Sequence, residues 1–274
     1  MKRCMPVLLS ACLLYACDEN TFESLRSSES IPTTAMDLRV AAEVHTHLGQ
    51  QGEADVTHTT LSAELFGEDD GGNYSIELHE ADQLNAQVDG VVTPLAASAY
   101  PSEQDKWQVY YYADFGNTDP RTEFWVSLNR ETEARVNSVP VTLLEDAGFS
   151  VAPADAEVPL TQLLTLEWTE TDGYEYNLEF VFACESIDGK SYFSRIRFPN
   201  SNVASIASPF TFNPVNFFTG PDPEKVTGCE LHSSLYGAEE QTAPADTTFN
   251  SVMVRSFRQH HTEKTITLVE AKTE

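Results

Sequence analysis

Basic residues are scarce in this chain of 274 residues, in which 16 Lys and Arg stand against 43 Asp and Glu, for a formal net charge of −27. Nucleic-acid binding depends on Lys and Arg that replace the counterions of the phosphates, so this balance argues against a nucleic-acid partner. The same field repels anionic lipid surfaces and attracts cations or basic partners. Solubility in a saline setting is the simpler explanation of the charge.

Short enzyme motifs are also missing from the sequence. There is no G-x-S-x-G nucleophile elbow, no H-E-x-x-H zinc motif and no glycine-rich phosphate loop. We therefore predict a non-enzymatic protein without a cofactor. A hydrolase with a pair of catalytic carboxylates hidden among the acidic residues stays open as an alternative.

Long apolar runs are absent except at the N-terminus, where Lys2 and Arg3 precede an apolar segment that ends at Ala16. This segment has the charged start and apolar centre of a secretory signal, and it is shorter than the roughly 20 residues that span a bilayer. Leu14, Ala16 and Cys17 resemble a bacterial lipobox, which implies cleavage before Cys17 and a diacylglyceryl group on its sulfur. Cys12 fits the same pattern but leaves about six apolar residues before the cut, against the usual 7–15.

An ordinary cleaved signal with incidental cysteines is the alternative. With the lipobox, residues 1–16 are the signal peptide, and the protein is expected in a bacterial cell envelope, anchored to a membrane through Cys17 and facing the periplasm or exterior. Several acyl chains make such anchoring effectively permanent. A protein or glycan of the envelope is the expected partner.

Only five cysteines are present, and three of them lie within the first 17 residues. The two that remain, Cys184 and Cys229, predict a disulfide in an oxidising compartment. A metal site built from two isolated cysteines is the weaker alternative.

Sequence periodicity predicts an all-β fold. Residues 17–35 are rich in Ser, Glu and Thr and are predicted to form a flexible tether that carries the lipid. From residue 36 onward apolar residues alternate with polar ones, as in half-buried strands, and no amphipathic helix is evident up to residue 145. Asp89-Gly90 between two β-rich runs predicts a two-residue hairpin.

A Pro-containing stretch near residue 148 is predicted to separate two antiparallel β-sandwich domains, one at 36–147 and the other at 148–274. In the second domain, strands are predicted at 163–168, 174–184, 192–198, 228–235, 249–257 and 265–269. Residues 199–225 hold five prolines and are predicted to form a long excursion.

The lipobox, the Ser-rich tether and the β-rich runs that include residues 82–86 and 123–130 together resemble uncharacterised bacterial lipoproteins with tandem immunoglobulin-like β-sandwich domains. The resemblance implies that fold and no particular activity. The chain departs from antibody-type domains because Trp168 precedes Cys184 instead of lying between the two cysteines.

Candidate metal ligands are few. His45 and His47 are separated by one residue, so on a strand their rings share one face, and with His58 or His79 they would suit zinc or copper. Solvated polar residues on a sheet face give the same pattern. The acidic segment 68–73, with Asp69 and Asp70, offers the oxygen ligands that calcium prefers but does not match the EF-hand loop, and a hairpin turn has the same composition.

Aromatic residues gather in two predicted strands and offer a candidate ligand-binding surface: Trp107, Tyr110, Tyr111, Tyr112 and Trp125. Exposed rings would suit a carbohydrate-binding or calcium-dependent adhesive module, whereas buried rings would be core. Strand alternation places Tyr110 and Tyr112 on the face opposite Tyr111.

A basic patch is the last candidate. It consists of Arg255, Arg258, His260, His261 and Lys264. The two histidines would titrate near neutral pH or bind an acidic partner. A strand end or loop without a special role is the simpler interpretation.

Overall fold

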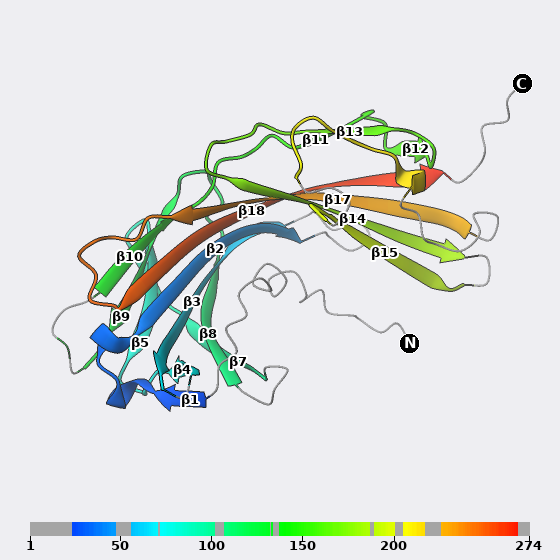
Figure 1. The fold of residues 1–274 in the computed structure, drawn as a ribbon. Coiled ribbons are helices and arrows are strands. Elements are labelled where there is room, and N and C mark those ends of the chain that lie inside the picture. Colours follow the sequence, from blue (N-terminus) through cyan, green and yellow to red (C-terminus); the bar gives the residue numbers. More distant parts are fainter. Residues whose placement is uncertain are drawn as a thin grey trace, which may run out of the picture.

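The computed structural model describes residues 24–47, 56–70, 72–101, 107–131, 133, 137–186, 189–200, 205–216 and 226–267. Over these ranges the regular structure consists of β-strands and three short 3-10 helices, η2 (Ser28–Ser30), η3 (Thr33–Ala35) and η4 (Pro214–Asn216). The mainly-β prediction is confirmed for this part of the chain (Figure 1). None of the helices described is long and apolar enough to cross a membrane.

Eleven strands form one large mixed sheet, in which the main path runs β1-β4-β3-β2-β18-β17-β14-β15. These strands are β1 (Ser24–Ser27), β4 (Gly72–Glu77), β3 (Val56–Asp69), β2 (Asp37–His47), β18 (Ser251–Thr267), β17 (Val226–Gln241), β14 (Glu175–Ser186) and β15 (Ser191–Phe198). Beside the path, β8 (Trp107–Phe115) pairs with β3 and β7 (Ala96–Pro101), and β12 (Glu157–Pro159) pairs with β18. The pairs β1–β4, β2–β18 and β12–β18 are parallel, so the sheet is mixed.

Two smaller antiparallel sheets pack on the large one. The first is β10 (Asn137–Thr142), β9 (Glu123–Asn129), β5 (Gln83–Val88) and β6 (Val91–Pro94). The second is β11 (Ser150–Ala152), β13 (Leu164–Glu167) and β16 (Phe210–Phe212). Each closes its own hydrophobic core: Phe124 packs in a cluster with Leu61, and Phe212 packs in a cluster with Phe180. Burial of these aromatic and aliphatic side chains is the main favourable term in the fold.

Both cores lie on the same face of the large sheet. Val254 of β18 belongs to the first core and Ile266 of the same strand to the second. Because side chains alternate along a strand, residues an even number apart share a face. We call the face that carries Val254 and Ile266 the inner face, and the opposite face, with the odd-numbered residues of β18, the outer face.

One large mixed sheet with two smaller antiparallel sheets is not clearly the pair of antiparallel sandwiches predicted from the sequence. Residues 251–258 of β18 pair in parallel with residues 37–44 of β2, while β18 also pairs along almost its whole length with β17. Figure 1 shows β18 running from the half that holds β2 and β10 to the half that holds β12 and β13. The two cores therefore share one sheet, and the C-terminal strand belongs to both.

The second half of the predicted tether is folded. Residues 24–27 form β1 against β4, and Ile31 is buried in the first core. Ser28 and Thr33 are also buried and are held by the guanidinium of Arg130, which donates to the carbonyl oxygen of Ser28 and to the hydroxyl of Thr33. Residues 24–35 are therefore part of the folded structure and not a flexible tether. Its first part, 17–23, lies outside the described residues.

The hairpin predicted at Asp89-Gly90 is present in the structure. Asp89 and Gly90 have φ of 50° and 78°, and Val88 pairs with Val91, as a two-residue hairpin with both central residues at positive φ requires. The C-terminal strand differs from its prediction, because the two runs 249–257 and 265–269 belong to one strand of 17 residues. Polar residues at 258–265 hid this strand. The odd-numbered ones lie on the outer face and need no apolar partner, and on the inner face Arg258 and Lys264 donate to backbone carbonyl oxygens.

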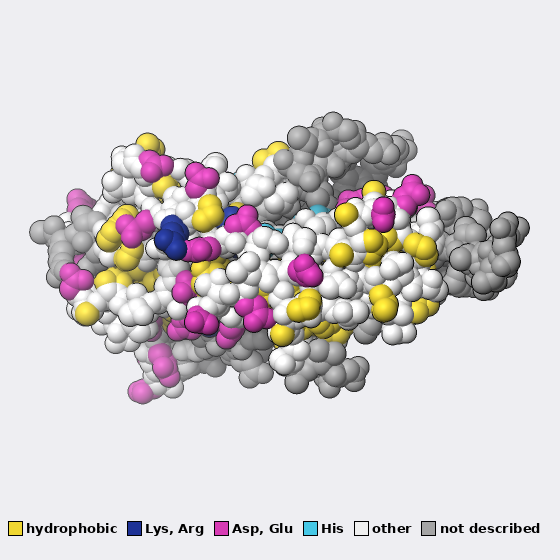
Figure 2. Space-filling model, turned by 90° about the horizontal axis from the view of Figure 1, so that it is seen from above, with side chains coloured by type: hydrophobic (Ala, Val, Ile, Leu, Met, Phe, Trp, Pro, Cys, Tyr) yellow, Lys and Arg dark blue, Asp and Glu magenta, His cyan; other side chains and the backbone are white. Residues whose placement is uncertain are grey.

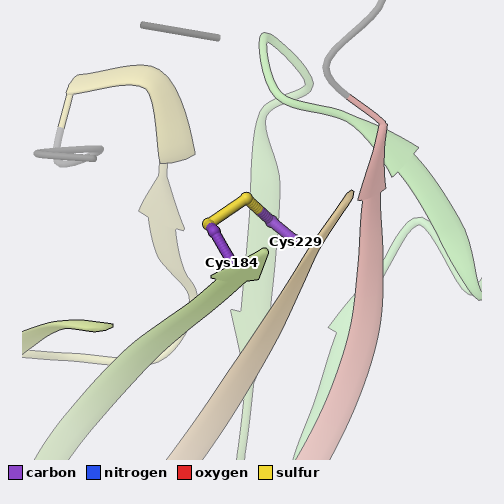
Figure 3. Close-up of a disulfide and its surroundings, with 2 residues drawn as sticks. All are labelled: Cys184 and Cys229. Atoms are coloured by element: carbon purple, nitrogen blue, oxygen red, sulfur yellow. A yellow bond between two sulfur atoms is a disulfide. The ribbon is translucent and has the colours of Figure 1, made fainter. Parts of the chain in front are cut away.

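The predicted disulfide is present. Cys184 at the end of β14 and Cys229 near the start of β17 are direct partners in the antiparallel register, and their Cα atoms are 4.1 Å apart (Figure 3). Both residues are buried in the second core. The bridge ties two neighbouring central strands across a separation of 45 residues.

Candidate functional site

The outer face of the large sheet carries buried charge. Arg39 and Glu64, on the neighbouring strands β2 and β3, are 5% and 2% exposed, and their side chains form an ion pair of 2.9 Å. Gln108 of β8 donates a further hydrogen bond to Glu64. Burial raises the pKa of Glu64, and the charge of Arg39 opposes that shift. Removing a charge from water costs several kcal/mol unless it is paired, so this pair holds β2 and β3 to one register.

Glu43 lies on the same face and lacks such compensation by a cation. It is aligned with Thr60 of β3 and Phe257 of β18, and it is 9% exposed. Burial raises the pKa of Glu43 to about 7. Desolvation is the cause, because the charged form loses its hydration.

Glu43 predicts a pH-dependent stability. A raised folded-state pKa means that the folded protein binds more protons than the unfolded chain between pH 4.5 and about 7, so stability falls as pH rises through this window. We expect Glu43→Gln to raise the free energy of unfolding at pH 8 by up to about 3 kcal/mol and to change it little at pH 4. Urea denaturation at a series of pH values measures this. Glu240→Gln, an exposed carboxylate of the outer face, is the matched control and should follow the wild-type profile.

Two histidines and a glutamate meet on the outer face of β17 and β18. His232 of β17 is aligned with Glu263 of β18, and His261 lies two residues before Glu263, on the same face. Each of the three residues offers a ligand atom within 4.8 Å of the other two. The Nδ1 atom of His232 lies 3.7 Å from a carboxylate oxygen of Glu263, and the two imidazole rings have their centroids 5.5 Å apart. We call these three residues the His–Glu cluster.

Two further polar residues face the His–Glu cluster. The Nε2 atom of His232 lies 3.7 Å from a carboxylate oxygen of Glu230 on the same strand. The Nδ1 atom of His261 lies 3.1 Å from the hydroxyl of Ser234, which also accepts a hydrogen bond from Gln259. These contacts orient the two rings from their far sides.

A hollow of about 350 Å³ adjoins the His–Glu cluster. Glu230 and Thr265 form part of its wall, together with Phe193, which is 75% exposed. The hollow lies at the disulfide end of the large sheet, where Cys184 and Cys229 also contribute to its lining. An exposed aromatic ring beside carboxylates offers both apolar and polar contacts to a ligand.

The histidine pair predicted from the sequence is brought together only in part. His45 of β2 and His58 of β3 are direct register partners with ring centroids 4.0 Å apart. His79 lies elsewhere, near Ser28 and Ala81. His47 is in β2, but its side chain lies outside the described residues. Among the described residues, three potential metal ligands come together in the His–Glu cluster. His45 and His58 are not part of this group.

The acidic segment 68–73 forms the end of the hairpin between β3 and β4, with Asp69 aligned with Gly72. The carboxylate of Asp69 accepts from Arg26, whose guanidinium also lies 3.9 Å from the ring centroid of Tyr74. Asp70 is exposed at the turn. The carboxylate of Asp69 is therefore paired with Arg26. The described residues of this turn do not bring together three acidic or histidine side chains that could hold a metal ion.

The predicted aromatic surface is divided between two sheets. Tyr112 of β8 is aligned with Ser62 and points to the outer face of the large sheet, whereas Trp125 of β9 lies on the far side of the first small sheet. Both are 41% exposed. Tyr110 shares the face of Tyr112, while Tyr111 is buried in the first core. Trp107 begins β8, and its side chain lies outside the described residues. These rings do not form one platform.

The five residues of the predicted basic patch do not share one surface, because they lie on opposite faces of β18. Arg258, His260 and Lys264 point to the inner face, where Arg258 donates to the carbonyl oxygens of Leu144 and Thr118. Lys264 donates to two carbonyl oxygens of the 153–155 segment, and Arg255, on the outer face, pairs with Glu240. Burial lowers the pKa of His260. His260 and His261 lie within β18 and point to opposite faces, so the strand-end interpretation is also wrong.

The His–Glu cluster was missed at the level of sequence for a physical reason. The spacing of His261 and Glu263 does place them on one face of a strand. His232 is about 30 residues away, and only the register of β17 against β18 aligns it with them. Carboxylates are spread over the surface seen in Figure 2, so acidic residues by themselves single out no site. The chain matches no protein-family model and none of the curated proteins with which it was compared.

Proposed function

We propose that this protein is a lipid-anchored lipoprotein of a bacterial cell envelope, whose folded part is a non-enzymatic binding module. The observation that carries the proposal is the Cys184–Cys229 disulfide. It pairs both cysteines beyond the signal segment with each other, so Cys17 is the one cysteine of the expected mature chain left without a cysteine partner. A buried disulfide also fits an oxidising compartment outside the cytoplasm.

The few residues between Cys17 and the first described strand support anchoring close to a membrane. β1 begins at Ser24, so about six residues separate the lipid attachment from the folded part. At most about 3.5 Å per residue, this linker spans on the order of 20 Å. The module then stays near the membrane surface, where the excess of acidic residues, −27 over the full sequence, disfavours contact with anionic headgroups.

The outer face of the large sheet is the proposed binding surface. The His–Glu cluster, the adjoining hollow and the exposed Phe193 all lie on it. The tandem immunoglobulin-like organisation remains part of the proposal. Two cores, each between two sheets, support it, whereas the parallel pairing of β2 with β18 is foreign to two independent antiparallel sandwiches.

Metabolic labelling with palmitate tests the anchor. We expect the wild-type protein to take up label and Cys17→Ser to take up none, because the thioether needs the Cys17 sulfur. Cys12→Ser is the matched control, since Cys12 belongs to the other lipobox-like stretch and leaves with the signal when cleavage occurs before Cys17. Undiminished labelling of Cys17→Ser, or loss of labelling in Cys12→Ser alone, would contradict the assignment.

A further inference from the structure

We infer that His232, His261 and Glu263 bind one divalent transition-metal ion of the zinc class on the outer face of β17 and β18. The two imidazoles and the carboxylate are the ligands, and a water or a group of a bound partner would complete the coordination. This site does not depend on the lipid anchor, and it gives the binding surface a specific chemistry.

The geometry of the strands brings the ligands close to bonding distance. Their ligand atoms lie within 4.8 Å of one another. Three atoms at that separation are at most about 2.8 Å from a common centre, and Zn–N and Zn–O bonds are about 2.0–2.2 Å long. Side-chain rotations that move each atom by less than about 1 Å therefore close the site without any change in the register of β17 and β18.

The surroundings of His232 set it up as a ligand. Its Nδ1 atom is buried, faces Glu263 at 3.7 Å and forms no hydrogen bond with any other described residue. Its Nε2 atom faces Glu230 at 3.7 Å. A proton on Nε2, directed to Glu230, leaves the lone pair on Nδ1, where the ion would lie. Metal-binding histidines usually donate their second N–H to such a carboxylate, which fixes the tautomer and raises the basicity of the ligand nitrogen.

His261 is oriented in the same manner from its other side. Its Nδ1 atom lies 3.1 Å from the hydroxyl oxygen of Ser234. A hydrogen bond donated to that oxygen places the lone pair of the ring on Nε2, the atom that would coordinate. Gln259 donates to the same hydroxyl oxygen, which restricts the position of Ser234 and so supports the ring.

The ligand set selects the class of ion. Imidazole nitrogen suits zinc, copper and nickel, whereas calcium and magnesium prefer sites made of oxygen alone. The carboxylates of Glu263 and Glu230 offset the two positive charges of the ion. Three protein ligands leave one position of a tetrahedral zinc ion open, which is the arrangement of zinc sites that bind a further molecule.

Isothermal titration calorimetry of the full chain in detergent, with Zn²⁺ as the ligand, tests this inference. We expect one ion per chain and no heat from Ca²⁺ or Mg²⁺ at the same concentrations. His232→Ala/His261→Ala should weaken Zn²⁺ binding by more than about 100-fold, and Glu230→Gln by about 10-fold, because loss of an orienting partner alone costs about 10–100-fold. Glu263→Gln, at an exposed position that tolerates the change, should weaken binding without loss of the fold.

His45→Ala/His58→Ala is the matched control, because it removes a second pair of adjacent histidines from the same face of the same sheet. It should bind Zn²⁺ as the wild type does. Circular dichroism checks that each variant is folded. The absence of Zn²⁺ binding by the wild type, equal binding by folded His232→Ala/His261→Ala, or equal losses in the two histidine pairs would each overturn the inference.

Discussion

Replacement of Arg130 by methionine should lower the free energy of unfolding by about 3–5 kcal/mol, the range for breaking a buried charged network on one side. Arg130 is 8% exposed, and its guanidinium nitrogens donate to five neighbours at 2.6–3.2 Å. These acceptors are the carbonyl oxygens of Ser28 and Ile31, the hydroxyl of Thr33 and the carboxylates of Asp82 and Glu133.

The loss is large because methionine fills much of the volume but donates no hydrogen bond. The carbonyl oxygen of Ile31 would then lose its donor from Arg130, while the carbonyl oxygen of Ser28 and the carboxylate of Asp82 would keep only their bonds from Ile31 N–H and the Ser28 hydroxyl. Each unsatisfied buried group costs about 1–3 kcal/mol. Segment 28–33 is attached to the first core largely through this network, so it should also become accessible to protease. Urea denaturation and limited proteolysis measure the two effects.

Arg26→Met is the matched control for Arg130→Met. Arg26 is also an arginine in an ion pair, with Asp69, but its side chain is 41% exposed. Exposed ion pairs contribute about 0–1 kcal/mol. If the two variants lose similar amounts of stability, the buried network does not hold the N-terminal segment, and the structural account of residues 24–35 fails.

Removal of the disulfide by Cys184→Ala/Cys229→Ala should lower the free energy of unfolding by about 4 kcal/mol in the chain-entropy model for a loop of 45 residues. The bridge restricts the unfolded chain more than it changes the folded one. Both cysteines are buried in the second core, so the small alanine side chains add a packing loss to the entropic one. Urea denaturation with tryptophan fluorescence follows the transition.

Reduction provides the independent check on the disulfide. Wild-type protein denatured in the presence of a strong reductant should lose stability comparable to that of the double variant, and the double variant itself should be insensitive to the reductant. A loss below about 1 kcal/mol in both experiments, or a reductant effect on the double variant, would show that the bridge does not stabilise the second core.

Period-two patterns carry most of the information that the sequence holds about this fold. The strands β2, β3, β8 and β9 follow from alternation of apolar and polar residues, because one face of each is buried in the first core. The turn at Asp89-Gly90 follows from local backbone chemistry, since both residues take positive φ. The pairing of Cys184 with Cys229 follows from elimination once three cysteines lie in the N-terminal segment.

The sequence by itself thus determined most of the strands, the apolar face of those strands and which cysteines pair, but it missed β1 and the middle of β18. Tertiary structure alone decided which strands are neighbours. Alternation identifies a face but not a partner strand, so nothing local indicates that β18 pairs with β2, more than 200 residues away, and joins two cores in one sheet. The pairing of β17 with β18 aligns His232 with Glu263. Tyr112 and Trp125 are separated because β8 pairs within the large sheet and β9 within the first small sheet. The candidate site depends on long-range pairing, and it became visible only with the sheet assembled.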